Sequence, residues 1–398
     1  MPSIFSKFTD VQCDVAGHTW DKSCRGSAFS ILINCLKYAL SVYVPLYTAS
    51  ALLNRKGKIY FMKKLYMEIA QSSAFLAANG FFMVVFFCLV RKILGGYYPW
   101  SAGFLPGCLS SFVAISIERK SRRGALAVYM LNTAFDTIFN MLKHHGLAKD
   151  VPFGEVIIFA AAASALGYMY RTKNLPDGFI KSIIQKGDVR KIKQTMIVTR
   201  SIDESRLHFE LSAKLAGKSF VVGYGIQTAY NFLMFLVKSK KSIGAFKRAL
   251  ISMDSLRLGG FCGSLVFLYN TIEKLLDRIN KGKEGMNSAI AGAVAGCSMV
   301  LQRSSYISLY VLSKTLELFY MNGIQKGQFP YIKHFDTILY TLCTGLMFHG
   351  AILQPTYLKP TYWNFLIKLT GKRFGDINRK YWDVLGYDSS LSPESIGR

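Results

Sequence analysis

Two stretches of the sequence decide the fold: AGFLPGC at residues 102–108 and AGAVAGC at residues 291–297. Each holds two glycines four positions apart inside an apolar run, and these are Gly103, Gly107, Gly292 and Gly296. That spacing puts the glycines on one face of a helix, where a neighbouring helix can approach closely. A third pair, Gly259 and Gly263, has the same spacing. The glycines predict close helix packing, either within one chain or at the seam of an oligomer.

Matches between the two parts of the chain continue on both sides of this stretch. Upstream, RKIL at 91–94 corresponds to EKLL at 273–276. Downstream, four residues recur 181 positions later as the same or a similar residue: Tyr129, Leu131, Asp136 and Glu155 correspond to Tyr310, Leu312, Glu317 and Asp336. Internal repeats are common in membrane transport folds. We expect an internal duplication, and chance similarity between glycine-rich apolar helices is the alternative.

The composition favours a membrane protein. Of 398 residues, 51% are hydrophobic and 18% are charged, whereas a soluble domain has about 25% charged residues. Ten apolar stretches can be identified, although several are shorter than the about 20 residues of a straight membrane-spanning helix. They lie at 28–53, 72–90, 101–117, 125–142, 155–170, 219–237, 258–272, 287–301, 305–321 and 336–353. The predicted fold class is all-α, a multi-pass integral membrane helical bundle.

Charge indicates how many of these stretches cross the bilayer. Lys and Arg number 49 against 23 Asp and Glu, a net charge of +26, and the cations concentrate in connections, where they meet lipid headgroups and fix orientation. Basic segments lie on both sides of the stretch 219–237, which conflicts with a crossing there. We therefore expect eight spans, four per half, with 28–53 and 219–237 interfacial or re-entrant. Ten spans, five per half, are the alternative.

This interpretation divides the chain into five segments. They are a Cys- and His-containing N-terminal segment at 1–27, a first membrane half at 28–170, a basic linker at 171–218, a second membrane half at 219–353, and a basic and then polar C-terminal tail at 354–398. The N-terminus has no apolar run typical of a secretory signal, so any targeting is expected to be internal.

The densest basic connection is SIERKSRRG at 116–124. Its cations are Arg119, Lys120, Arg122 and Arg123. They suit anionic phospholipid headgroups or an acidic protein, although a basic turn can also serve as a topology signal alone. Because the basic residues alternate with apolar stretches, nucleic acid is not expected as a partner.

Two further groups of residues are candidates for chemistry. Cys13, His18 and Cys24 are residue types that bind zinc, but no fourth ligand lies near them and no C-x2-C spacing is present. A thiol pair or free cysteines therefore account for them equally well, and no metal or other cofactor is expected. Asp136 and Glu317 lie within apolar runs, where acids are costly and often functional. Lys314 is placed to pair with Glu317 on one helix face.

The sequence contains no nucleophile elbow, Walker loop, dinucleotide fingerprint or H-E-x-x-H motif. We therefore expect no enzyme activity.

Several long strings resemble the transmembrane protein 135 family. They include GHTWDKSCR at 17–25, SVYVPLY at 41–47, SSAFLAANG at 72–80, RKILGGYYPW at 91–100, IERKSRRG at 117–124, HFDTILY at 334–340, LKPTYWNFLIKLTGKRF at 358–374 and NRKYWDV at 378–384. The central linker is shorter than in the vertebrate members of that family. A weaker resemblance, to the four-span proteins of the mitochondrial protein-import translocases, agrees with four spans per half but is analogy at the level of fold.

The resemblance implies a non-enzymatic regulator in mitochondrial and peroxisomal membranes. Its implied roles are promotion of mitochondrial fission through the dynamin-related GTPase, peroxisome organisation and lipid metabolism. Candidate partners are anionic lipid headgroups, the fission machinery and a second copy of the chain. The alternative function is a transporter or translocase for a lipid-derived metabolite, which the duplication and the paired acids favour.

Overall fold

The computed structural model describes residues 7–174, 184–185, 188, 204–237, 251–387 and 389. All regular elements in this part of the chain are helices, so the predicted all-α fold is confirmed. The chain forms two compact units: unit 1 joins residues 1–149 with 332–398, and unit 2 is residues 150–331. Of the predicted basic linker, only a few residues and the segment from 204 onward are described, and the basic segment 238–248 lies outside the described residues.

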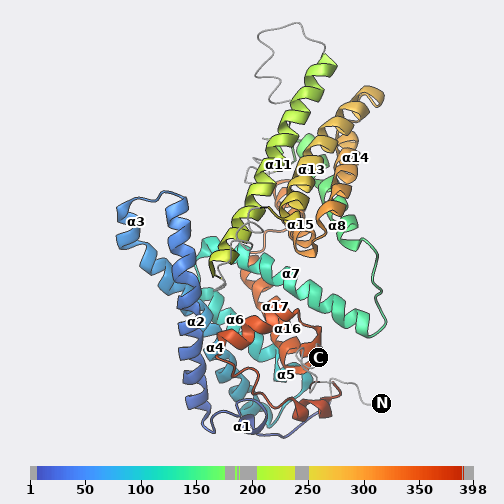
Figure 1. Ribbon diagram of the computed structural model, residues 1–398. Coiled ribbons are helices and arrows are strands. Elements are labelled where there is room, and N and C mark those ends of the chain that lie inside the picture. Colours follow the sequence, from blue (N-terminus) through green and yellow to red (C-terminus); the bar gives the residue numbers. More distant parts are fainter. Residues whose placement is uncertain are drawn as a thin grey trace. The chain divides into compact units, whose positions relative to one another are not determined.

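Unit 1 is a bundle of long and short helices. Its helices are α1 (Cys13–Ala16), α2 (Cys24–Leu53), α3 (Lys58–Lys63), α4 (Leu65–Leu94), α5 (Pro99–Ala102), α6 (Phe104–Ile117), α7 (Lys120–His144), α16 (Phe335–Leu353) and α17 (Pro360–Leu369), with 3-10 turns η3 (Pro355–Tyr357) and η4 (Arg379–Leu385). Helix α2 packs on α4, α4 on α6, and both α6 and α7 pack on α16 (Figure 1). The short α3 lies in the connection between α2 and α4 (Figure 1).

The described residues of unit 2 form helices that pack in a similar arrangement. They are α8 (Gly154–Arg171), α11 (Glu204–Val237), α13 (Met253–Ile279), α14 (Glu284–Gly296), the 3-10 turn η2 (Cys297–Gln302) and α15 (Ser305–Gln325). Helix α11 packs along α13, α13 on α14, and both α14 and α15 pack on α8 (Figure 1).

The two units use the same set of helix contacts when their helices are paired as the duplication predicts. The pairs are α2 with α11, α4 with α13, α6 with α14, α7 with α15, and α8 with α16. In unit 1 the fifth helix is α16, which comes from the second half of the sequence, and in unit 2 it is α8, from the first half. The predicted halves at 28–170 and 219–353 thus follow one another along the sequence. Each packing unit, however, takes its fifth helix from the other half.

A backbone feature recurs at the start of both exchanged helices. Phe153 precedes α8 and His334 precedes α16, and each has a left-handed φ of 60°. These residues are 181 positions apart, the same offset that relates Glu155 to Asp336. A left-handed conformation is uncommon for a residue other than glycine, so its recurrence at matched positions supports the duplication.

Glycines hold the exchanged helices close to their partners. A side chain at Gly103 would lie 2.8 Å from the His349 Cα on α16, and one at Gly292 would lie 2.4 Å from the Ala163 carbonyl oxygen on α8. Gly259 and Gly263 face Phe220 of α11 in the same way. The predicted close packing is therefore made within the chain, and an oligomer seam at these glycines is not needed to explain them.

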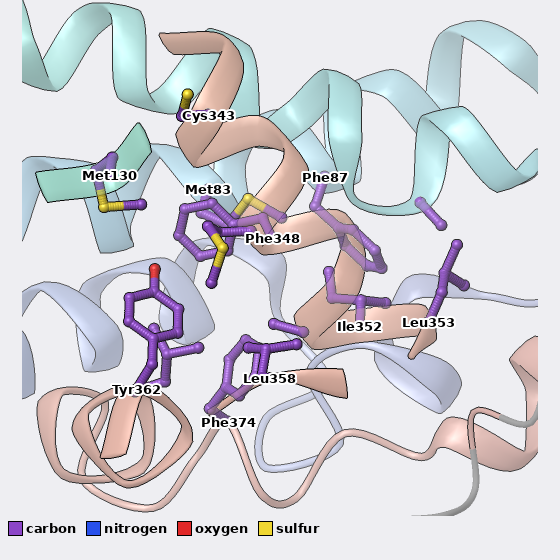
Figure 2. Close-up of a cluster of buried hydrophobic side chains, with 14 of the residues drawn as sticks. Met83, Phe87, Met130, Cys343, Phe348, Ile352, Leu353, Leu358, Tyr362 and Phe374 are labelled. Atoms are coloured by element: carbon purple, nitrogen blue, oxygen red, sulfur yellow. The ribbon is translucent and has the colours of Figure 1, made fainter. Parts of the chain in front are cut away.

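The core of unit 1 brings together residues from both ends of the sequence (Figure 2). It contains Met83 and Phe87 of α4, Met130 of α7, Phe348 and Leu353 of α16, and residues of the C-terminal segment. Those C-terminal residues are Leu358, Tyr362, Trp363, Leu366, Phe374, Trp382 and Leu385. The described part of the predicted tail is thus folded against the helices that precede it.

Five helical segments among the described residues are long and apolar enough to cross a bilayer. They are Cys24–Leu52, Leu65–Leu94, Pro99–Ile117, Lys120–His144 and Phe335–Leu353, and all five lie in unit 1. Both stretches for which a re-entrant hairpin was an expectation, 28–53 and 219–237, lie in continuous helices, α2 and α11. The re-entrant hairpin is therefore wrong for both, and the total of eight or ten spans stays a prediction.

Because backbone atoms of α16 and α8 cannot move away easily, Gly103→Ala and Gly292→Ala should each destabilise the protein by about 1–3 kcal/mol. Gly124→Ala and Gly225→Ala are matched controls, since an added methyl group at either position meets no atom within 4 Å. Thermal unfolding of the purified protein in detergent measures the difference. An unchanged unfolding temperature in both test variants would contradict the packing described.

Candidate functional site

The N-terminal segment brings four potential metal ligands together at one end of α2 and α4. Cys13 begins α1, His18 follows α1, Cys24 begins α2 and Cys88 lies near the end of α4. One ligand atom from each residue lies within 4.8 Å of the others. The first three are the weak candidates of the sequence, and Cys88 is the fourth ligand that the sequence did not reveal.

Local hydrogen bonds shape the loop that carries this Cys/His cluster. The Ser23 side chain caps α2 by accepting from the Gly26 amide, and the Asp21 carboxylate accepts from the Ser23 amide at 2.8 Å. Gly17 sits against Phe87, whose ring would be 2.3 Å from an added Cβ. These contacts turn the chain so that His18 and Cys24 face Cys13.

His18 is held in one orientation. Its side chain is buried, and Nδ1 lies 2.8 Å from the Asp21 carbonyl oxygen. Because a carbonyl only accepts, this contact assigns the proton to Nδ1 and leaves a lone pair on Nε2. Nε2 is buried and has no hydrogen-bond partner among the described residues.

The sulfur atoms form a cluster of interacting thiols. Cys13 Sγ lies 3.5 Å from Cys24 Sγ, far longer than the about 2.05 Å of a disulfide. A hydrogen bond with Cys88 lowers the pKa of the Cys13 thiol to about 4. A thiolate is the form in which cysteine acts as nucleophile or ligand, so this site can bind a soft metal ion or form a disulfide.

A groove of about 470 Å³ opens beside the Cys/His cluster. Its lining combines the three cysteines with apolar side chains of α2 and α4 and with the cations Arg25, Arg91 and Lys92. Arg91 also fastens the N-terminal segment, because its Nε donates to the Val11 carbonyl oxygen at 2.6 Å.

The predicted basic loop lies at the other end of α4 and is largely turned inward. Glu118 has a fully buried side chain between Arg119 and Arg122, with Arg122 Nη1 3.1 Å from Glu118 Oε2. Arg119 Nη1 also lies 2.8 Å from Glu68 Oε1. Arg123 donates to the carbonyl oxygens of Glu118 and Ser116.

This Glu118 network has further members that the sequence did not single out. The Tyr47 hydroxyl accepts from both Arg119 and Arg122, and Ser72 contacts Tyr47 at 3.0 Å. Of the four predicted loop cations, Lys120 alone is exposed. The loop therefore joins α2, α4 and α7 by hydrogen bonds and partly buried ion pairs, and its exposed charge comes from one lysine.

The two acids predicted to lie at equivalent depth have different surroundings. Asp136 is mostly buried, with 14% of its side chain exposed, and forms an ion pair with Lys359 just before α17. Glu317 has 48% of its side chain exposed, and its carboxylate lies 2.6 Å from Lys314 Nζ, which confirms the predicted pair. Asp136 belongs to unit 1 and Glu317 to unit 2.

Unit 1 also contains a partly open cavity of about 280 Å³ that the sequence did not predict. Aromatic and aliphatic side chains of α2, α4, α7, α16 and α17 line most of it. Its polar groups include Asn79, Tyr340 and Thr344, with Asn79 Nδ2 3.3 Å from the Tyr340 hydroxyl. An apolar cavity with a few polar groups is typical of a small-molecule site.

Removing the buried charge of the Glu118 network should destabilise unit 1. Glu118→Gln leaves Arg119 and Arg122 partly buried without their shared carboxylate, a loss on the order of 3 kcal/mol. Lys120→Gln, next to it on the exposed side, is the matched control. The check is thermal unfolding in detergent, and equal unfolding temperatures for the two variants would show that the buried pairs contribute little.

Comparison with known proteins agrees with the resemblance found in the sequence. The family model described as the N-terminal cysteine-rich region of Transmembrane protein 135 matches residues 10–142, about one third of the chain. The match includes all four residues of the Cys/His cluster and the whole Glu118 network. No solved structure matches the chain. The apolar membrane-length helices indicate a multi-pass membrane protein, and its residues 10–142 are similar to the N-terminal region of the transmembrane protein 135 family.

Proposed function

We propose that the protein is a non-enzymatic regulator of mitochondrial membranes that promotes fission through the dynamin-related GTPase, with a role in peroxisome organisation and lipid metabolism. The similarity of residues 10–142 to the transmembrane protein 135 family supports this proposal. The observation that carries it is a strongly basic surface at one end of unit 1, which suits recruitment of a soluble partner with an acidic surface.

This basic end is built from two connections that meet in space. Besides the Glu68–Arg119 ion pair, Gln71 Nε2 of α4 donates to the Ile117 carbonyl oxygen at the end of α6, at 2.7 Å. The connection from α2 to α4 therefore lies beside the loop from α6 to α7. The exposed cations of the basic end are Arg55, Lys56, Lys58, Lys63, Lys64 and Lys120.

The acids of the basic end leave this charge uncompensated. Its two acids, Glu68 and Glu118, are engaged by Arg119 and Arg122. Near an anionic bilayer each exposed cation adds about 1 kcal/mol of attraction, and the same charges steer an acidic protein surface toward the membrane. The loop at 116–124 thus contributes one exposed cation to the basic end, and α3 with the residues beside it contributes the others.

Reversing the charge of α3 tests the proposal. Lys58→Glu, Lys63→Glu and Lys64→Glu together should reduce mitochondrial fission frequency and the amount of dynamin-related GTPase on mitochondria, because the acidic partner is repelled. Lys281→Glu, Lys283→Glu and Lys326→Glu, in exposed turns of unit 2, provide an equal charge change elsewhere. If both triple variants reach the membrane at equal amounts and support equal fission, the basic end is not the recruiting surface.

The second candidate function is a transporter for a lipid-derived metabolite, and the cavity of unit 1 is the observation that favours it. Its volume of about 280 Å³ exceeds an apolar cavity of about 150 Å³ that holds benzene. Asp136 does not line this cavity, and its charge is neutralised by Lys359. The cavity, and not the pair of acids, is therefore the candidate substrate site.

Uptake of fatty acyl-CoA into liposomes that contain the purified protein separates the two functions. The regulator predicts no uptake above that of protein-free liposomes. The transporter predicts uptake that falls severalfold in Thr344→Met, whose longer side chain fills part of the cavity, and that persists in Glu317→Gln, which lies in unit 2 and is exposed.

A further inference from the structure

We propose that Cys13, His18, Cys24 and Cys88 bind one zinc ion, which fastens the N-terminal segment to the membrane helices α2 and α4. This site is independent of the basic end and of the proposed role in fission. Three thiolates and one imidazole form a common donor set for zinc sites that stabilise a fold.

The spacing of the ligand atoms fits a tetrahedral ion. Zn–S and Zn–N bonds of about 2.3 and 2.0 Å place neighbouring ligand atoms about 3.5–3.8 Å apart in a tetrahedron. The Cys13 and Cys24 sulfur atoms are 3.5 Å apart, and all four ligand atoms lie within 4.8 Å of one another. Shifts of about 1 Å, within the reach of side-chain rotation, would complete the coordination.

His18 supplies a second, independent observation. Its Nδ1 donates to the Asp21 carbonyl, and the buried Nε2 has no hydrogen-bond partner among the described residues. A metal-binding histidine is typically oriented in this way, by a backbone carbonyl or carboxylate on its other nitrogen. Without a metal, a buried polar nitrogen without a partner costs about 1–3 kcal/mol, and a zinc ion would remove that cost.

The surroundings favour both the charge and the closed geometry of the site. Three thiolates around Zn²⁺ leave one negative charge, which Arg25 and Arg91 beside the cysteines can offset. Four protein ligands leave no open position for a substrate, so the site is structural. The ligands come from α1, the turn after it, α2 and α4, and one ion would therefore cross-link the N-terminal segment to two long helices.

The competing chemistry is a disulfide between Cys13 and Cys24, formed by loss of two electrons and two protons to an oxidant. It would consume two of the three sulfur ligands and leave Cys88 and His18 without a role. Metal content and thiol state distinguish the two outcomes directly.

The test uses the full-length protein purified in detergent without chelators. Elemental mass spectrometry should give one zinc per chain, and each of Cys13→Ser, Cys24→Ser, Cys88→Ser and His18→Gln should reduce zinc content at least severalfold. Cys108→Ser and Cys262→Ser, which change cysteines outside the Cys/His cluster, should leave it unchanged. Cobalt exchanged into the wild type should show the intense visible absorption of a tetrahedral thiolate site.

A wild-type measurement keeps the proposal testable if the variants do not fold. Zinc should slow alkylation of Cys13, Cys24 and Cys88 relative to the chelator-treated protein, and leave the rate at exposed Cys297 unchanged. Wild-type protein without zinc, with Cys13 and Cys24 joined by a disulfide, overturns the proposal. So does zinc that remains in every cluster variant, because it would then be bound elsewhere.

Discussion

The close approach of helix backbones at small residues is the interaction on which both units depend. In unit 1, Gly103 between α5 and α6 and Gly107 of α6 allow α16 to approach closely, and in unit 2 the glycines of α14 do the same for α8. In lipid no hydrophobic driving force brings apolar helices together. Membrane helices therefore associate through van der Waals contact, and small residues at the interface allow closer contact. The same contact made twice, with the last helices exchanged, joins segments that are far apart in the sequence. Neither unit is complete without a helix from the other half.

Much of the fold could be predicted from the sequence, because the signals that specify it are local. Apolar runs of suitable length predict helices, and the paired glycines predicted close packing that the structure confirms. The exchange of α8 and α16 could not be predicted. Both helices are equivalent in the repeat, so either can fill either position, and a sequence match says nothing about which unit each one joins. The re-entrant hairpins were predicted from the charge of the flanking segments. This prediction was wrong, because both stretches lie in unbroken helices, α2 and α11.

The candidate sites were harder to predict, because they join residues with no fixed spacing. Cys13, His18 and Cys24 lie in one short segment, but Cys88 looks like a small apolar residue in a membrane helix until α4 brings it to the N-terminal segment. Glu118 is likewise one acid in a basic run, and its burial between Arg119 and Arg122 appears only when α2 and α4 surround it. The number of cations in the loop therefore exceeds the number that are exposed to solvent.

Unit 1 has two chemically different ends, the basic end and the Cys/His cluster, which lie at opposite ends of α4. Glu68 at the basic end and Cys88 in the Cys/His cluster are 20 residues apart on α4, about 30 Å along a helix, which is the thickness of the hydrocarbon core. Labelling with an impermeant thiol reagent in sealed organelles, on a chain without native cysteines, tests this directly. Lys58→Cys and Ser121→Cys should label from one side and Lys22→Cys from the opposite side. Labelling of all three from the same side would contradict a membrane-spanning unit 1.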